Sequence, residues 1–297
     1  MGRFALSRSG NILVHNGYGI GRDIINSSGL QSYTIRVQYP EGFDPSTADS
    51  YHMYSEAMRD EFTRRGTWTQ VSTSPNIWDR RIASASWKWL FAYDYALMAV
   101  IDANSTGVTD MSYLFYNSGI RYEMQRIAPI LSMCNFDTSS VTKAYGMFQS
   151  TSISGYLPKF DLRNVTDFGM FCWGSTDILG VSINISAATS MFAAFGECRG
   201  LLNLELTGYP RNLTNIALLC NGCVKLKHVP NFNTVQSVTN AYSAFQQCYL
   251  VESGAYSLYS KLKVLNPVPT HTNTFLSCGR DTVTGAAELE QIPSGWK

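Results

Sequence analysis

Cysteine is the residue type whose spacing in this sequence comes closest to a chemical site. The chain has 297 residues and seven cysteines, and Cys220 and Cys223 form a Cys-x-x-Cys pair. Thiolates at this spacing can bind zinc or exchange disulfides. A structural zinc site needs four ligands, yet the sequence holds neither a second Cys-x-x-Cys pair nor a Cys-x-x-His pair. The pair therefore provides only half of a zinc site.

The cysteines also recur at a regular interval. Three of them are 25 residues apart, each nine residues after a threonine: Cys198, Cys223 and Cys248. Three others each lie six residues after a threonine: Cys172, Cys220 and Cys278. Small residues that recur with the period of a repeat are typical of buried side chains stacked on one another. Because the total is also odd, we expect reduced structural thiols, with no disulfide framework and no metal.

The other residues with chemical potential do not combine into a catalytic or cofactor site. The four histidines are scattered without a nucleophile motif: His15, His52, His228 and His271. No pair of carboxylates has a spacing suited to acid–base catalysis, and the glycines of residues 16–21 (NGYGIG) lack the spacing of a dinucleotide-binding loop. We therefore predict that the chain is not an enzyme and has no catalytic residue and no cofactor.

The composition narrows the classes of partner. Only 15% of the residues are charged and the formal net charge is +1. The chain therefore lacks the excess of positive charge that attracts a protein to nucleic acids or to anionic membranes. No apolar run approaches the roughly 18 residues of a membrane span, and the first 14 residues do not form a secretory signal peptide. We expect no nucleic acid partner and no membrane insertion. The surface must be uncharged, polar and rich in tyrosine, a composition associated with adhesins and virus particles.

A repeated segment is the main structural signal. Seven segments begin with a threonine, usually after valine, and carry apolar residues behind it; the threonines are Thr109, Thr142, Thr166, Thr189, Thr214, Thr239 and Thr272. Their spacings are 33, 24, 23, 25, 25 and 33 residues. A period of this length is characteristic of leucine-rich repeats, in which each unit buries its apolar face against its neighbours.

Each unit has a second half that alternates apolar and polar residues, as in residues 181–185 and 204–206, which predicts a short strand with one buried face. The half that begins with threonine predicts one or two helical turns, with the threonine hydroxyl capping the first N–H groups. The predicted fold class is therefore α+β: a leucine-rich-repeat-like solenoid of about seven strand-plus-helical-turn units of 23–33 residues, with a non-repeat N-terminal domain.

The units resemble a known family. Residues 136–148 (FDTSSVTKAYGMF) and 160–171 (FDLRNVTDFGMF), with the cysteines that follow later units, are similar to the BspA-type leucine-rich repeats of bacterial surface proteins and mycoplasma-type lipoproteins. The resemblance covers roughly residues 105–280. It implies a right-handed solenoid with a sheet on one face, used for binding. Members on cell surfaces carry a signal peptide or lipobox, and neither is visible here.

The first hundred residues lack the repeat. They predict a hairpin or extended segment in residues 3–14, a strand in residues 32–39 and a helix in residues 48–65. Four of the six tryptophans follow: Trp68, Trp78, Trp87 and Trp89. Tryptophan is favoured at interfaces, so these four are candidate docking residues, and the same region can cap the solenoid. We expect three parts: a docking and capping domain in residues 1–100, the solenoid in 101–280 and a tail in 281–297.

Two functions from different classes fit these features. The first is a structural and binding protein of a bacteriophage particle, made in the host cytoplasm, as a tail, fibre or head-decoration component. Its partners would be other virion proteins, in an oligomeric assembly, and a host-surface receptor that is a protein or a glycan. The second is a bacterial cell-surface or secreted adhesin. In both, we expect Lys159, Glu205 and Lys225 to line the exposed sheet face that binds the ligand.

Overall fold

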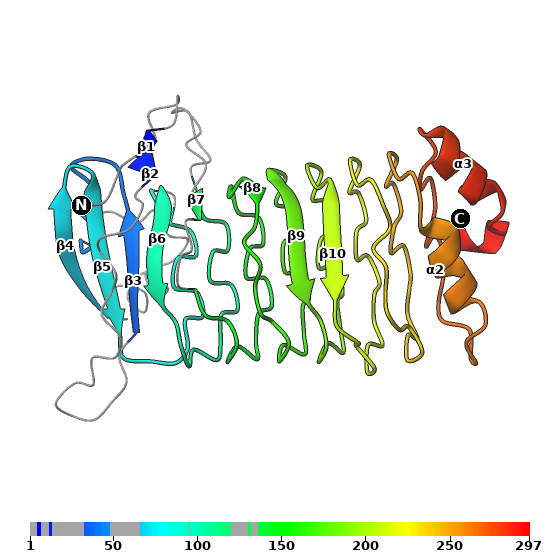
Figure 1. Cartoon of the computed structure of the whole chain (residues 1–297), viewed down its shortest axis with the longest axis horizontal. Helices are drawn as coiled ribbons and strands as arrows, with labels where there is room; N and C mark the ends of the chain where they lie inside the picture. Colours follow the sequence, from blue (N-terminus) through cyan, green and yellow to red (C-terminus); the bar gives the residue numbers. More distant parts are fainter. Residues whose placement is uncertain are drawn as a thin grey trace.

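The computed structural model describes residues 5–6, 12–13, 33–47, 66–94, 96–119, 130–131 and 136–297. The predicted helix of residues 48–65 lies outside the described residues. Figure 1 shows an elongated arrangement, in which an N-terminal sheet, a stack of repeats and two C-terminal helices follow one another along the long axis. None of the described helices is long and apolar enough to cross a membrane.

The N-terminal sheet has five strands in the order β4-β5-β3-β6-β7. Their bounds are β3 (Tyr33–Gln38), β4 (Thr67–Thr73), β5 (Asn76–Ile82), β6 (Ala99–Asn104) and β7 (Ile130–Leu131). The first four strands are antiparallel and β7 is parallel to β6. Alternate residues of β5 are buried, as expected for a strand with one face on the core. β3 matches the strand predicted for residues 32–39, and β1 (Ala5–Leu6) pairs with β2 (Ile12–Leu13) where a hairpin was expected.

The repeats stack in parallel register through their turn segments. We define a turn segment as ten residues, positions 0 to 9, and the segments begin at Ala85, Thr109, Thr142, Thr166, Thr189, Thr214, Thr239 and Pro269. Backbone N–H groups at positions 2, 4, 6 and 8 donate to carbonyls of the next segment, as from Ile216 to Asn240 (2.9 Å) and from Cys220 to Ala244 (2.8 Å). Neighbouring units are therefore joined by main-chain hydrogen bonds as well as by their core.

Two of these segments differ from the sequence prediction. The first begins at Ala85, inside the region expected to lack repeats, because the Thr109 N–H donates to the Ala85 carbonyl (2.8 Å). The last begins at Pro269 and not at Thr272, because Thr270 forms a parallel bridge with Asn240. The predicted alignment of the last unit was therefore wrong by three residues.

The turn segments are not helical. Within a segment, successive hydrogen bonds join residues three apart, as from Leu219 to Ile216 (3.2 Å) and from Asn221 to Leu218 (3.2 Å). Left-handed backbone recurs at positions 4 and 8, and all thirteen non-glycine residues with positive φ fall there: Trp89, Tyr93, Tyr113, Asn117, Ser150, Met170, Ala193, Glu197, Leu218, Ser243, Gln247, Asn273 and Ser277. A right-handed helix cannot contain a left-handed residue every four positions. Each segment is a chain of tight turns.

The predicted α+β leucine-rich-repeat-like solenoid of strand-plus-helical-turn units is therefore wrong. The described residues form the N-terminal sheet, a small parallel sheet and hydrogen-bonded turns, with only two short α-helices, both at the C-terminal end. The parallel sheet has the order β10-β9-β8, from β8 (Gly155–Tyr156), β9 (Ile178–Asn184) and β10 (Asn203–Thr207). On the same side of the stack, other neighbouring units are joined by isolated β-bridges, such as the bridge between His228 and Ser253.

Large apolar side chains fill the interior of the stack. Position 6 holds a row of buried residues: Phe91, Phe115, Phe148, Cys172, Phe195, Cys220, Phe245 and Phe275. Neighbouring rings in this row lie against one another, with centroids 5.7 Å apart for Phe91 and Phe115 and 5.5 Å for Phe115 and Phe148. Aromatic rings at this separation gain energy beyond the burial of their area.

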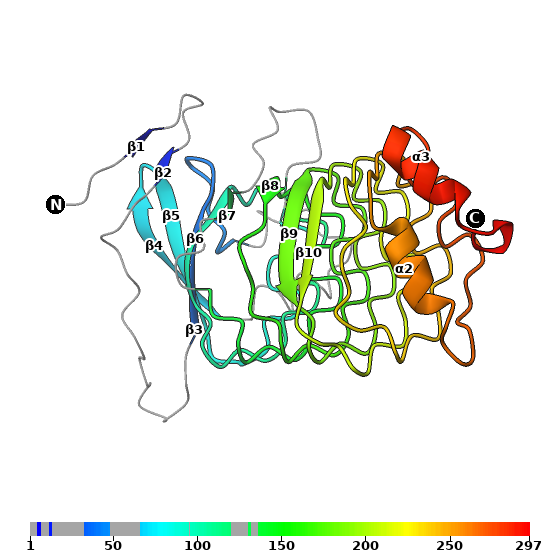
Figure 2. The ribbon, with the colours of Figure 1, turned by 45° about the vertical axis from the view of Figure 1, so that its right-hand side comes forward.

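Two helices cover the last units. α2 (Ala255–Leu262) and α3 (Val283–Glu290) are followed by the 3-10 turn η2 (Ser294–Trp296), and Figure 2 shows both helices at the C-terminal end. The Phe275 N–H donates to the Trp296 carbonyl (2.9 Å), and the Trp296 ring stacks on His271 with centroids 4.1 Å apart. Residues 281–297, expected as a tail, thus contain helical structure packed on the stack. The boundary expected at residue 100 falls inside β6.

Candidate binding surface

The exposed face of the parallel sheet presents side chains of successive units in register. Tyr156 of β8 pairs with Gly180 of β9, which pairs with Asn203 of β10. A Cβ at Gly180 would collide with the Tyr156 ring, so glycine is required where that ring lies. Tyr156 nevertheless remains 63% exposed. The face therefore offers an aromatic ring beside amide groups.

Lys159 and Glu205 lie on this face, but Lys225 does not. Phe160 bridges Ile183, which places Lys159 beside Ser182, and the Ser182 hydroxyl donates to Glu205 Oε2 (2.6 Å). Lys225 belongs to another part of its unit, because the Lys227 N–H donates to the Leu202 carbonyl, just before β10 begins. All three predicted residues are exposed. The structure thus brings two of them together and leaves the third at a corner.

His228 and Ser253 continue the same face toward the C-terminal end. The His228 Nδ1 and the Ser253 Oγ are 3.0 Å apart, and Lys227 forms an ion pair with Glu252 (3.0 Å). A serine nucleophile needs a base that is itself oriented by a third group. In the described part of the chain no carboxylate is hydrogen-bonded to His228, and the pair is exposed. These contacts suit a binding surface better than a catalytic centre.

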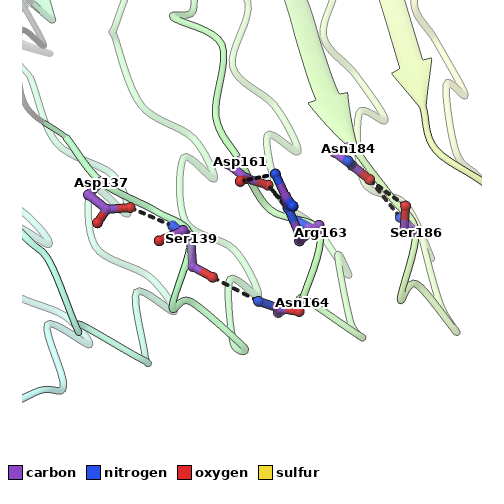
Figure 3. Close-up of polar contacts among 7 residues, drawn as sticks. All are labelled: Asp137, Ser139, Asp161, Arg163, Asn164, Asn184 and Ser186. Atoms are coloured by element: carbon purple, nitrogen blue, oxygen red, sulfur yellow. Dashed lines mark hydrogen bonds and ion pairs between the residues drawn. The ribbon is translucent and has the colours of Figure 1, made fainter.

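Polar side chains form a row at the corner that follows the sheet. Asp137, Asp161 and Asn184 each accept the N–H two residues ahead, and Figure 3 shows the row on neighbouring units. The Asn164 amide joins two units by donating to the Ser139 carbonyl (2.7 Å). The side-chain oxygens of Asp137, Asp161 and Asn184 thus stabilise the turns that follow these residues.

These hydrogen bonds keep the two aspartates ionised. Hydrogen bonds from Ser139 lower the pKa of Asp137, and the side-chain hydrogen bond from Arg163 lowers the pKa of Asp161. Among the described residues, no group of three His, Cys, Asp or Glu side chains is placed to hold a metal ion. The corner is therefore a row of partnered polar groups on the outside of the stack.

The threonines that revealed the repeat form an exposed row on the turn side. Thr142, Thr189, Thr214 and Thr239 each donate their hydroxyl to the carbonyl of the preceding threonine, at 3.0 to 3.2 Å. The expectation that they cap helical turns is wrong, because there is no helix to cap. Their role is to add a side-chain hydrogen bond to each junction between units.

Two of the four candidate docking tryptophans are core residues. Trp87 is fully buried and Trp78 is 8% exposed, with its Nε1 donating to Asn76 (2.7 Å), so neither can contact a partner in this structure. Trp68 and Trp89 are half-buried. Trp68 lies on β4, where the Arg80 guanidinium packs over its ring (4.9 Å), and Trp89 stacks on Tyr113 (4.0 Å). The structure does not bring the four together.

A row of aromatic residues on the turn side was missed by the sequence analysis. Trp89, Tyr113 and Tyr145 follow one another across three units, and burial raises the pKa of both tyrosines. Tyr113 packs on Gly146, and Tyr145 packs on Gly169. In each case the aromatic residue precedes the glycine by one repeat length, 33 and 24 residues. An aromatic residue followed by a glycine one repeat length later is therefore a sequence pattern that could have predicted this row.

The described cysteines are buried in the stack. Cys198, Cys223 and Cys248 occupy position 9, and each thiol lies 2.9 to 3.0 Å from the position 6 carbonyl of the preceding unit. The sequence analysis grouped Cys278 with Cys172 and Cys220, six residues after a threonine. This grouping was wrong, because Cys278 also occupies position 9. Burial raises the pKa of Cys172, Cys198, Cys220 and Cys248 well above the ordinary value, which disfavours the thiolate that metals and disulfide exchange require.

Comparison with known proteins adds no relative. No protein-family model matches the chain, and neither a curated protein nor a solved structure matches it significantly. The resemblance to BspA-type repeats therefore stays a prediction that rests on the quoted residues.

Proposed function

We propose that this chain is a non-enzymatic structural and binding protein of a bacteriophage particle. In this proposal the repeat stack presents an extended binding surface to a host receptor, and the N-terminal sheet attaches the chain to its assembly. The observation that carries the proposal is the alignment of exposed side chains on successive units, from Lys159 through Ser182 to Glu205.

Three features support an extended ligand surface on which opposite charges offset one another. Strands of neighbouring units lie about 4.8 Å apart, so an ordered row of side chains can contact a chain-like ligand at several points. On this face the cation of Lys159 and the carboxylate of Glu205 offset one another, while Asn203 and Thr207 add neutral donors and acceptors. Many weak contacts over a long surface suit adhesion better than the enclosed site that catalysis needs.

The class of the protein can be tested by localisation. An antibody raised against the chain would be applied to lysed and intact cultures of the organism that encodes it, followed by immunogold electron microscopy. Gold on phage particles is the expected result. Gold on the surface of intact cells would overturn the particle assignment in favour of the adhesin, and label on neither would overturn both.

The proposed binding face can be tested with alanine variants of its charged residues. The double variant Lys159→Ala/Glu205→Ala should lose about tenfold or more in affinity for host cells, because two charged contacts are removed from the face. Lys225→Ala is the control, since this exposed lysine lies away from the face and should bind within about twofold of the wild type. Equal losses in both would show that binding is not located on the β8-β9-β10 sheet.

A further inference from the structure

The outermost strand of the N-terminal sheet, β4, has an open edge. It pairs with β5 on one side only, and no described residue pairs with its other side. Five of its seven residues are exposed, including Val71 at 41%, and the strand reads TWTQVST with no charge and no proline. Soluble proteins normally protect such an edge with lysine, proline, a β-bulge or a covering element. Among the described residues, β4 has no lysine, no proline and no covering element, and its one irregularity is the register shift between Gln70 and Ser72.

Toward the C-terminal end the stack continues from unit to unit. Each turn segment donates hydrogen bonds to the next one, and Figure 1 shows β7 on the side of the sheet that faces the repeats. At the far end, α2, α3 and η2 cover the last units. The hydrogen bonds that run along the molecule thus stop at β4, which Figure 1 places at the end opposite to the helices.

We propose that β4 pairs antiparallel with β4 of a second copy of this chain, around a two-fold axis near Gln70. Self-pairing about this residue, where the pairing of β4 with β5 shifts register, sets the first half of β4 opposite its second half, so no like charges face one another. A charged partner strand would gain nothing from an uncharged edge, whereas an identical edge is matched in length and polarity. The two five-stranded sheets would become one continuous sheet of ten strands.

This pairing has a defined geometry. Because strands join along the long axis of the molecule, the dimer extends that axis and places a helical cap at each distal end. Trp68 of each copy would lie next to the junction, on the face where Tyr39 and Arg80 already contact its ring. The proposed function assigns the N-terminal sheet to assembly, and the β4 pairing names a second copy of the chain as a partner of that sheet. The pairing is a property of the isolated chain, so it can be tested without a phage or a host.

The oligomeric state of the purified full chain tests the pairing. Sedimentation equilibrium should give twice the 33.0 kDa of one chain, with dissociation on dilution. The double variant Thr69→Lys/Val71→Lys should weaken dimerisation at least tenfold, because four lysines then meet across the junction. Thr207→Lys is the control, since it adds an exposed strand lysine away from β4 and should leave the dimer intact.

A cysteine variant keeps the test independent of folding. Gln70→Cys should give a disulfide-linked dimer on oxidation, and wild-type chain treated alike reports any background from native thiols. Each lysine variant must also keep the wild-type urea midpoint at a dilution at which the wild-type dimer has dissociated, which separates lost pairing from lost folding. A wild-type chain that is monomeric at every soluble concentration overturns the proposal, as does a dimer that resists the lysine pair or lacks the Gln70→Cys crosslink.

Discussion

The two ends of this molecule are finished in different ways. At the C-terminal end, Trp296 packs on His271, Phe275 and Tyr259, and it is only 6% exposed. At the N-terminal end, β4 exposes most of its side chains and leaves one edge without a described neighbour. A repeat stack needs both ends covered, since each unit buries apolar surface only against a neighbour. The C-terminal end is closed by helices and Trp296, whereas the N-terminal sheet ends at a strand with one unpaired edge among the described residues.

The interiors near the two ends also differ. Beneath the N-terminal sheet, Arg80 is fully buried and donates to the Leu90 carbonyl (2.6 Å), and Tyr39 donates to the buried Asp94 (2.6 Å). Position 9 of the turn segments begins with Asp94 and continues with Ser118, Thr151 and Ser175, before cysteines replace these polar groups. Stability at the N-terminal end therefore depends on pH and on hydrogen bonds more than at the C-terminal end.

The largest expected effect concerns one tryptophan at each end. Trp296→Ala should lower the free energy of unfolding by about 3 to 5 kcal/mol, because it opens a cavity against Phe275. Trp68→Ala should cost about 1 kcal/mol, since this half-buried ring contributes mainly its contacts with Tyr39 and Arg80. Urea unfolding followed by circular dichroism measures both. If the two losses are equal, the N-terminal end is as tightly closed as the C-terminal one, and the comparison fails.

The next effect is a pH dependence confined to the N-terminal end. Burial raises the pKa of Asp94 to about 6 from 3.8, although hydrogen bonding by Tyr39 and the charge of Arg80 oppose the shift. The folded chain thus keeps this proton up to about pH 6, while the unfolded chain loses it near pH 4. Stability therefore falls as pH rises through that window, by about 1 to 1.5 kcal/mol between pH 5 and 7.5.

The variant Asp94→Asn isolates this contribution. It cannot ionise, so the wild type should lose about 1 to 1.5 kcal/mol more than the variant over the same pH range. Depressed carboxylates such as Asp137 and Asp161 act in the opposite direction but are common to both proteins, so they cancel in the difference. Parallel stability curves for the two proteins would show that Asp94 is not held in a desolvated site.

The smallest effect compares one turn position in units near each end. Position 4 is Ser243 near the C-terminal end, with φ 50°, and its buried hydroxyl has no partner among the described residues. Position 4 is Gly146 nearer the N-terminal end, with φ 59°. Ser243→Gly should stabilise the chain by about 1 kcal/mol, since it removes a left-handed serine and an unsatisfied hydroxyl.

The reverse variant serves as the matched control. Gly146→Ser should destabilise by at least about 1 kcal/mol, because its Cβ would meet the Tyr113 ring as well as the left-handed backbone. Thermal melts can resolve both changes. A destabilised Ser243→Gly variant would mean that this hydroxyl contributes to the unit next to the cap.

The repeat could be predicted from sequence, but its conformation could not. Val-Thr pairs and cysteines 25 residues apart mark the central units, and those units do stack in register. The helical interpretation failed because left-handed backbone is visible in sequence only where glycine occupies it, as at Gly146, Gly174 and Gly222. Elsewhere residues such as Leu218 and Met170 adopt it, since hydrogen bonds between units outweigh their local preference.

The two ends were the hardest parts to predict. The first turn segment contains Trp87 and Phe91 but no Val-Thr pair, so its threonine signal is missing. In the last segment Pro269 takes the place of the threonine and Thr272 gives a misleading match, so only the spacing of Phe275 and Cys278, which repeats that of Phe245 and Cys248, indicates the observed alignment. For the exposed face of the parallel sheet, alternation predicted the outward positions of Lys159 and Glu205, whereas the position of Lys225 depends on the register between units.

The constant turn side and the variable strand side have a consequence for how such a gene can change. Every turn segment spans ten residues, but the last unit accommodates α2 between Cys248 and Pro269. Duplication of one 25-residue unit in frame would lengthen the protein by about 4.8 Å and leave every junction chemically similar. Recombination could therefore change the length of the molecule by whole units, while insertions on the strand side change the residues that each unit exposes.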